Sequence, residues 1–341
     1  MTTLLETTFA RYLPLIEEEM SAIVQTTEPR HAGLFGMLRY HMGWADAEFN
    51  PCQAQIGKRI RPMLCLLSCE ACGGAGEQAL PAAAALELMH NFTLIHDDIE
   101  DGDKTRRGRT AIWALWGIAQ GINVGDTLFA LAQLSLVRLA ERHVPAQTIV
   151  EAVRCLNDTC VSLTGGQYLD IGFESRGQVS IADYLAMVEG KTAALASCSC
   201  SLGTLVAAAP AVQRKHLAAF GYHMGMAFQM RDDVLGIWGD PDVTGKPAGA
   251  DIARHKKSLP IIHGLERSAE LRALFEQDVL STADVRRATE LLGETESREY
   301  AEQLMLEHHS LALDELAAAN AQGQAAQVLY ELARALLNRE R

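Results

Sequence analysis

Helix-forming residues fill this chain almost from end to end, and this pattern limits the possible folds more than any other feature. Alanine, leucine, glutamate and glutamine dominate, only 10 of the 341 residues are proline, and alternating β-branched runs are nearly absent. We therefore expect no strand. Helix breaks are predicted at Asn50-Pro51, Gly73-Gly74, Gly102, 106–108, Val144-Pro145, 239–249 and Gly293. The sequence predicts an all-α fold in the form of a large helical bundle.

The chain carries no mark of a domain boundary. Neither a shift in composition nor a low-complexity linker interrupts it. Residues 1–341 are therefore predicted to form a single domain. The ends, from 1 to about 50 and from about 262 to 341, look like amphipathic helices used for packing or subunit contact.

Charge and hydrophobicity exclude several classes of protein. The formal net charge is −13, which argues against a nucleic-acid partner, because binding a phosphate backbone requires a broad basic face. The N-terminal stretch contains Glu6 and lacks the features of a signal peptide. The uncharged run 192–213 is built from small residues and contains Pro210, so it fits a buried helix better than a membrane span. We expect a cytoplasmic protein without a transmembrane segment.

The strongest local signal is an acidic helix end that contains Asp97, Asp98, Glu100 and Asp101. On a helix Asp97 and Asp101 project from one face about a turn apart. Their charges repel unless cations neutralise them, and magnesium that bridges carboxylates to a substrate phosphate fits this arrangement. A solvated acidic helix end is the alternative, but the apolar approach 89–95 argues against it.

A second acidic pair, Asp232 and Asp233, lies far downstream inside another apolar helical stretch, 228–235. Either pair alone would be weak evidence. Two apolar helices that each carry paired aspartates suggest metal ions clamped between them.

Two basic clusters accompany the acids, one at 57–62 and one at 104–109. Guanidinium groups bind phosphate oxygens in pairs. Each cluster alone would more often be a solvated surface. Together with two acidic motifs they favour binding sites for diphosphates.

From Gly57 to Pro260 these motifs occur in the order that is typical of one family, and the chain resembles the trans-isoprenyl diphosphate synthases of the farnesyl and geranylgeranyl type. The resemblance implies an isoprenoid-synthase fold with a central active-site cavity, three Mg²⁺ ions and a homodimer. It implies metal binding by Asp97, Asp98, Asp101, Asp232 and Asp233.

The same resemblance implies roles for further residues. Isopentenyl diphosphate would be bound by Lys58, Arg61, His90 and Arg107. The allylic diphosphate would be bound by Arg106, Lys191, Thr192, Gln229, Lys246 and Lys256. The residues expected to act in catalysis are Asp97, Asp98, Asp101, Arg106, Lys191, Thr192, Gln229 and Asp232.

Phe92 and Thr93 are the expected determinants of chain length. Thr93 lies one turn before Asp97 on the same helix face, and Phe92 matches the position whose bulk forms the pocket floor in the family. A phenyl ring there favours C20 or C15 products, with geranylgeranyl diphosphate as the first choice. Ordinary core packing of the ring is the alternative.

The chain departs from the family pattern at two positions. Gly236 stands where the second motif usually has a third aspartate, with Asp240 about a turn later, so one metal-ligand or supporting contact is in question. Ile56 stands where many members have glycine, and we regard this difference as minor.

The implied activity is condensation of isopentenyl diphosphate with dimethylallyl, geranyl or farnesyl diphosphate by a magnesium-assisted prenyltransferase. A class I terpene cyclase is the alternative, although it has no second diphosphate for Lys58, Arg61 and Arg107 to bind. A non-catalytic partner subunit of a prenyl synthase is a further alternative. Such a subunit would be expected to have lost an acidic pair, whereas this chain keeps both.

Overall fold

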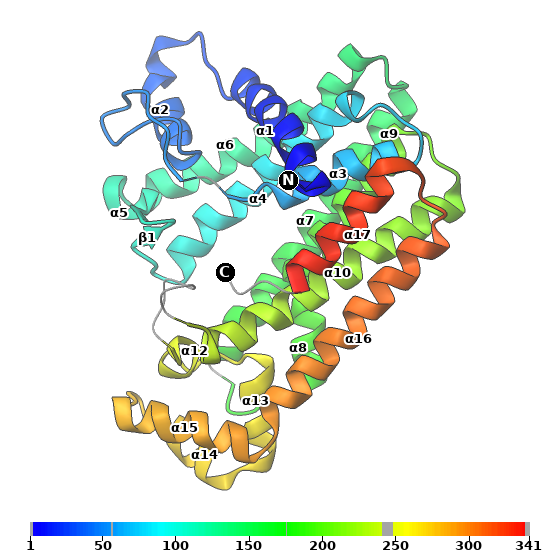
Figure 1. The fold of residues 1–341 in the computed structure, drawn as a ribbon. Helices are drawn as coiled ribbons and strands as arrows, with labels where there is room; N and C mark the ends of the chain where they lie inside the picture. The colour runs from blue at the N-terminus through cyan, green and yellow to red at the C-terminus, as the bar shows by residue number, and fades with distance from the viewer. Residues whose placement is uncertain (1–2, 56, 175, 241–247, 338–341) are drawn as a thin grey trace. The chain divides into compact units, whose positions relative to one another are not determined.

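The computed structural model describes residues 3–55, 57–174, 176–240 and 248–337, and Figure 1 traces them as a mainly helical chain. The all-α prediction is confirmed. The chain groups into two compact units. The first comprises Met1–Leu156, Ser201–Ala209 and Gln322–Val328, and the second comprises Asn157–Cys200, Pro210–Ala321 and Leu329–Arg341. The single domain expected over 1–341 stays a prediction.

The first unit is built around α4 (Leu80–Glu100), which packs against α3 (Ile60–Ala71) and α6 (Ile118–Val137). Pro81 stands in the first turn of α4, where a missing N–H costs nothing. Fourteen residues of α4 are buried, so the helix is apolar on most sides, as expected of a central core helix. The remaining elements are α1 (Leu4–Ile23), η1 (Pro29–His31), α2 (Ala32–His41), η2 (Gly76–Ala79), α5 (Ile112–Trp116) and η3 (Arg138–Arg142).

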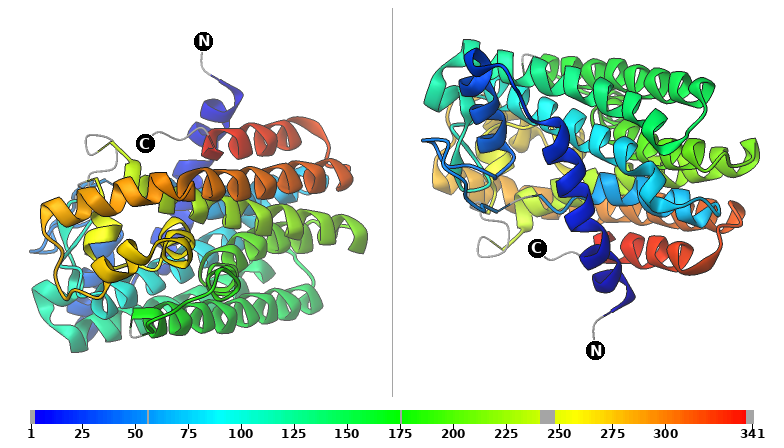
Figure 2. Two further views of the ribbon diagram at one scale, coloured as in Figure 1. Left: turned by 90° about the horizontal axis from the view of Figure 1, so that it is seen from below. Right: turned by 90° about the horizontal axis from the view of Figure 1, so that it is seen from above.

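The second unit is built around α10 (Ala211–Trp238) and α16 (Ser297–Ala318), which lie side by side (Figures 1 and 2). Its core includes Phe173, Tyr184, Met226 and Met230. Its other elements are α8 (Ile181–Val188), η4 (Glu189–Ala193), α12 (Ala250–Ala253), α13 (Leu259–Arg267), α14 (Ala269–Phe275) and α15 (Thr282–Glu294). Three helices contribute residues to both units: α7 (Ala146–Glu174), α9 (Ala194–Val206) and α17 (Gly323–Leu337).

The expectation of no strand is wrong at one point. Strands β1 (Thr105–Arg106) and β2 (Arg109–Thr110) pair antiparallel, and the two residues between them, Arg107 and Gly108, both have positive φ, at 52° and 73°. This is the backbone twist that two-residue hairpins favour. Two-residue strands are too short to give an alternating pattern, so the sequence carries no signal for them.

The uncharged run 192–213 is helical in its first part and includes α9. Pro210 lies at the N-terminal boundary of α10 rather than inside a helix. Among the described residues, no helix combines the length and the apolar character needed to cross a membrane.

Candidate active site

The first acidic motif lies at the C-terminal end of α4. Asp97 and Asp98 are in the last turn of the helix, and Asp101 caps it. The carbonyl end of a helix carries partial negative charge, so these carboxylates repel both one another and the helix dipole. A cation at this helix end would relieve both repulsions.

Arg106 of the hairpin compensates one of these acids. Its Nε donates to Asp98 Oδ1 over 2.8 Å, and its terminal nitrogen donates to the same oxygen. Burial raises the pKa of Asp98, and the charge of Arg106 opposes that shift. Asp98 is therefore held by an arginine, while Asp97 and the exposed Asp101 lie beside it at the helix end.

Two of the residues expected to bind isopentenyl diphosphate are in direct contact. The guanidinium of Arg61 lies 3.3 Å from Nε2 of His90. Arginine can only donate, so Nε2 of His90 accepts and the ring proton is on Nδ1. Burial lowers the pKa of His90 well below its usual value, and the charges of Arg61 and Arg107 add to the shift. His90 is therefore neutral.

Arg107 joins this group through the hairpin turn. A Cβ placed on Gly57 would lie 2.7 Å from a terminal nitrogen of Arg107, so the guanidinium packs directly on the backbone beside the exposed Lys58. Burial lowers the pKa of Arg107. Arg61, Arg107 and Lys58 thus form a concentration of positive charge that an anion would stabilise.

Arg109 of the same basic cluster has a structural task. It donates to the backbone oxygens of Tyr40, over 2.7 Å, and Ala45, over 2.6 Å. Its guanidinium also stacks on the Tyr40 ring, 3.9 Å from the centroid. These contacts tie the hairpin to α2.

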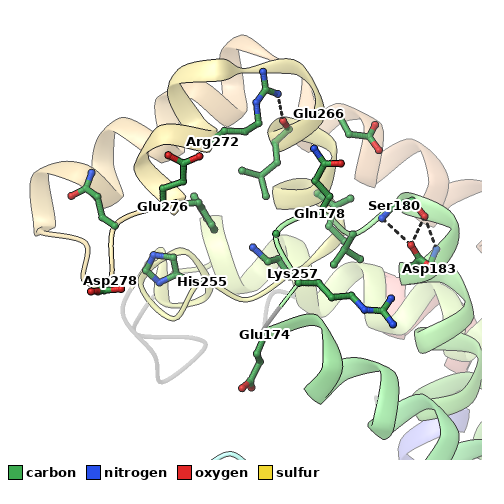
Figure 3. A pocket seen from close by; sticks show the side chains of 17 residues that line it. Glu174, Gln178, Ser180, Asp183, His255, Lys257, Glu266, Arg272, Glu276 and Asp278 are labelled. Carbon is green, nitrogen blue, oxygen red and sulfur yellow. Dashed lines mark hydrogen bonds between the residues drawn. The ribbon is translucent and has the colours of Figure 1, made fainter.

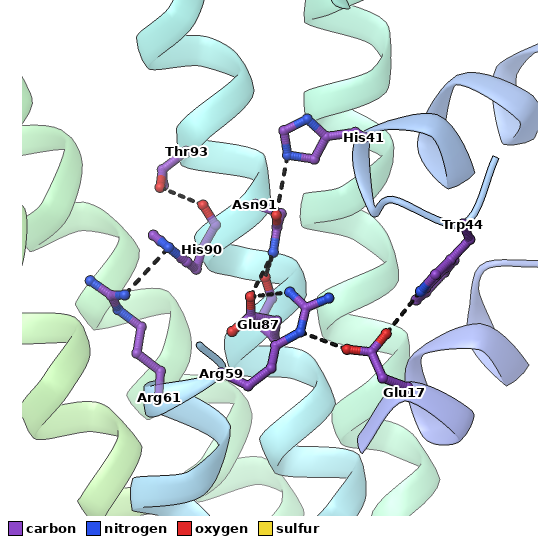
Figure 4. A network of polar contacts seen from close by, with 9 residues as sticks. All are labelled: Glu17, His41, Trp44, Arg59, Arg61, Glu87, His90, Asn91 and Thr93. Atoms are coloured by element: carbon purple, nitrogen blue, oxygen red, sulfur yellow. Dashed lines mark hydrogen bonds and ion pairs between the residues drawn. The ribbon is translucent and has the colours of Figure 1, made fainter. Parts of the chain in front are cut away.

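A buried polar network holds the basic cluster 57–62 in place (Figure 4). Arg59, between Lys58 and Arg61 in sequence, is fully buried and pairs with Glu87 of α4 at 2.5 Å and with Glu17 of α1 at 2.7 Å. Asn91 donates to Glu87 and contacts His41 over 3.1 Å. Arg59 has a positive φ of 53°, a backbone conformation that is unfavourable for residues other than glycine. Its ion pairs with Glu17 and Glu87 hold it in that conformation.

The two expected chain-length residues lie on adjacent faces of α4. Phe92 is half-buried, and its ring lies 5.0 Å from that of His96 and 5.5 Å from that of Phe129 on α6. Thr93 is buried and donates to the backbone oxygen of His90. Phe92 is thus part of an aromatic group between α4 and α6.

The second acidic motif belongs to the second unit, on the last two turns of α10. Asp233 is buried and accepts hydrogen bonds from Tyr184 Oη at 2.7 Å, Leu259 N at 3.0 Å and Gln229 Nε2 at 3.0 Å. Burial raises its pKa, and these donors and Lys256 oppose the shift. Asp233 therefore joins α8, α10 and α13, while Asp232 beside it remains partly exposed.

Lys191 and Thr192 lie in η4, a π-helical turn of the type that often marks functional sites. Two glycines, Gly166 on α7 and Gly190 in η4, allow the two helices to approach closely. A Cβ on Gly166 would lie 2.2 Å from the backbone nitrogen of Lys191. Lys191 forms an ion pair with Asp170 of α7. Thr192 donates to Gln229 over 2.9 Å, which completes a chain of hydrogen bonds from Thr192 to Asp233.

Lys256 follows α12. Desolvation lowers its pKa, but surrounding carboxylates outweigh that effect and raise the pKa above the usual value. These carboxylates belong to Asp233, Asp251, Asp170 and Asp232. The lysine is therefore charged. Lys246, also expected to bind the allylic diphosphate, lies outside the described residues, as does Ile56.

The donor chemistry fits magnesium. Asp97, Asp98, Asp101, Asp232 and Asp233 all offer hard carboxylate oxygens. Among them Asp98 pairs with Arg106, and Asp233 accepts hydrogen bonds from Tyr184, Gln229 and Leu259. In the described part of the chain no three metal-binding side chains converge. Magnesium is compatible with that arrangement, because it commonly takes only one or two carboxylates and completes its shell with water and substrate phosphates.

A separate open pocket of about 1100 Å³ lies in the second unit. Figure 3 shows charged residues of both signs around it, including Glu174 and Lys257. None of the residues expected from the sequence lines it. His255 and Lys257, which line the pocket, flank Lys256 in the sequence.

Several residues that shape these groups were not predicted from the sequence. They are Arg59, Asp170, Tyr184 and Asp251. Asp170 lies one turn after Gly166 on α7, so it shares the helix face that approaches Lys191. The others contact the expected residues only through tertiary structure.

Comparisons with known proteins show the family of the chain. Residues 45–292 match the family described as polyprenyl synthetase. Geranylgeranyl diphosphate synthase of Mycobacterium tuberculosis is 45% identical over 276 residues, which are 80% of this chain and 77% of that protein. The (2E,6E)-farnesyl diphosphate synthase of Mycobacterium bovis is 38% identical over 312 residues, which cover 89% and 86%.

Solved structures share the fold. A polyprenyl synthetase from Streptomyces coelicolor A3(2) superposes with a TM-score of 0.87 at 35% identity, covering 98% of each chain. Geranylgeranyl pyrophosphate synthetase from Pyrococcus horikoshii superposes with a TM-score of 0.86 at 31% identity, covering 98% of this chain and 99% of that one.

Proposed function

The chain belongs to the polyprenyl synthetase family and is a trans-prenyltransferase, and we propose that it condenses isopentenyl diphosphate with allylic diphosphates to form geranylgeranyl diphosphate. The observation that carries this proposal is the contact of Arg61 with His90 and the packing of Arg107 beside Lys58. This cationic group suits a second diphosphate, which a terpene cyclase does not need.

We propose that Asp97, Asp101 and Asp232 hold magnesium ions, of which the family resemblance implies three. When bound, magnesium supplies Lewis-acid stabilisation of charge on the leaving pyrophosphate. Asp98 orients Arg106, and Asp233 orients Gln229. These two acids serve as supports for the residues that touch substrate.

In the proposed reaction the allylic C–O bond breaks first. Arg106, Lys191 and Lys256 donate to the diphosphate and stabilise its growing charge. Oxygens of Thr192 and Gln229 face the allylic cation, and Lys58, Arg61, Arg107 and the Nδ1–H of His90 hold isopentenyl diphosphate. Its double bond attacks the cation, and the departing pyrophosphate takes the proton. No enzymic base is required.

Mass spectrometry of the products tests the function. Purified protein is incubated with magnesium, isopentenyl diphosphate and, separately, C5, C10 and C15 allylic diphosphates. We expect a homologous diphosphate series that ends at C20. Hydrocarbons or alcohols from the allylic substrate alone would instead mean a cyclase, and no turnover would indicate a missing partner subunit.

Phe92→Ala is expected to lengthen the product beyond C20, because it removes the ring that we propose as the pocket floor. Phe49→Ala is the matched control: it deletes another half-buried ring, which stacks on Trp116 instead. Its product should stay unchanged. An unaltered product distribution in Phe92→Ala would assign this ring to core packing.

We also propose a homodimer. Large apolar side chains of α6 are exposed, including Ile118 at 54%, Leu134 at 56% and Val137 at 55%. We propose that these exposed apolar side chains take part in the subunit contact. Sedimentation equilibrium should give twice the chain mass of 37.1 kDa, and a single chain mass at micromolar concentration would contradict the proposal.

A further inference from the structure

Gly236 departs from the second acidic motif, and its surroundings show what fills the space. It stands four residues after Asp232 on α10, so the two positions share a helix face. A Cβ placed on Gly236 would lie 2.2 Å from Oδ2 and 2.6 Å from Cγ of Asp251. The carboxylate of Asp251 therefore occupies the volume that a side chain at position 236 would need.

The backbone fixes Asp251 in this place. The N–H of Gly249, just before α12, donates to the carbonyl oxygen of Ile237 over 3.0 Å. The N–H of Lys256 donates to the carbonyl oxygen of Asp251 over 2.9 Å. Asp251 is 8% exposed. Its position against α10 thus follows from main-chain bonds on both sides of it.

Asp251 also lies close to Lys256, near the second acidic motif. Its Oδ2 lies 3.9 Å from Nζ of Lys256. Three residues after Lys256, the N–H of Leu259 donates to the carboxylate of Asp233 over 3.0 Å. The segment 251–259 therefore contacts both the second acidic motif and, through Asp251, the position of Gly236.

We propose that Asp251 supplies the carboxylate that the second acidic motif lacks at Gly236, and that it acts as a positioning residue for Lys256 and Asp232 in binding magnesium diphosphate. The inference rests on the proposed function, because it assigns those two residues to the diphosphate. It also explains why position 236 is glycine: any larger residue would displace the Asp251 carboxylate.

Moving the carboxylate from position 251 on α12 to position 236 on α10 tests the inference. Each atom of Asp251 within 3.1 Å of the added Cβ belongs to the carboxylate, so Asp251→Ala makes room for Gly236→Asp. Binding of inorganic pyrophosphate is measured by calorimetry over a magnesium series, alongside kcat, KM and thermal melting. Gly236→Asn/Asp251→Ala is the control of equal shape without charge.

We expect Asp251→Asn and Gly236→Asp each to weaken pyrophosphate binding about tenfold, which is about 1.4 kcal/mol, and to raise the magnesium concentration at half-maximal binding. Gly236→Asp/Asp251→Ala should regain most of the loss, and the asparagine control should not. Asp240→Asn, which neutralises the exposed carboxylate a turn later, should bind as wild type.

Three outcomes would overturn the inference: wild-type binding by Asp251→Asn, equal recovery by the asparagine and aspartate double variants, or loss in Asp240→Asn alone. Melting without magnesium shows whether each variant is folded, and Asp251→Asn keeps the side-chain shape where alanine does not. A wild type that binds pyrophosphate but does not condense isopentenyl diphosphate overturns the proposed function alone. A wild type that binds no pyrophosphate overturns both.

Discussion

Asp97→Asn is expected to lower kcat on the order of 10³-fold, because a lost Lewis-acid contact costs several kcal/mol of transition-state stabilisation and each 1.36 kcal/mol is tenfold in rate. Asparagine keeps the shape of the side chain and removes one of the charges that repel at the end of α4. The variant should therefore fold at least as well as wild type. Steady-state kinetics at saturating substrate and magnesium, with thermal melting, measure both effects.

Glu100→Gln is the matched control for Asp97→Asn. It removes one negative charge from the same helix end, but Glu100 is exposed and has no proposed role, so kcat should change little. Equal losses in the two variants would mean that the general charge of this helix end matters rather than a ligand at Asp97. Full activity of Asp97→Asn in a complex with another chain would favour a non-catalytic partner subunit.

The parts of the candidate site that could be predicted from the sequence depend on local geometry. Asp97 and Asp101 share a face because they are four residues apart on a helix, and the all-α fold follows from helix-forming composition. Resemblance then supplied Lys58, Arg61 and His90 as a group, and the contact of Arg61 with His90 fits it. The roles in catalysis and metal binding remain proposals.

The parts that could not be predicted depend on tertiary contacts or on very short elements. The cover of Gly236 by Asp251 depends on where α12 packs, and no periodicity encodes that. The hairpin around Arg107 depends on two residues with positive φ, one of which is not glycine. The π-helical turn at Lys191 is five residues long, too short to alter the helical pattern around it.

Arg59 illustrates the same limit for charge. In the sequence it is one of three cations in 57–62, and all three look equally suited to bind an anion. In the structure its side chain is 0% exposed and paired with Glu17 and Glu87, whereas Lys58 is exposed. Burial, which a short motif does not reveal, separates the cation that supports the loop from those that we propose bind substrate.

Arg59→Met is therefore expected to lower the free energy of unfolding by about 3–5 kcal/mol, because it leaves the buried Glu87 without its ionic partner. The folded fraction should also show a raised KM for isopentenyl diphosphate, because Lys58 and Arg61 lose the anchor between them. KM for the allylic substrate should change less. Urea unfolding and steady-state kinetics with each substrate varied in turn measure these effects.

Two further variants separate burial from the mere loss of an ion pair. Arg30→Met breaks an ion pair with Glu28, but the Arg30 side chain is 85% exposed and water replaces its partner, so stability should stay near that of wild type.

Arg59→Met/Glu87→Met removes both buried charges, and apolar replacement of a buried pair is often neutral. Glu17 remains partly exposed and can be hydrated. The double variant should therefore regain most of the stability lost in Arg59→Met. Its KM for isopentenyl diphosphate should stay raised, because the loop is no longer anchored by charge. If the double variant is as unstable as Arg59→Met, packing of the arginine stem rather than the stranded carboxylate accounts for the loss.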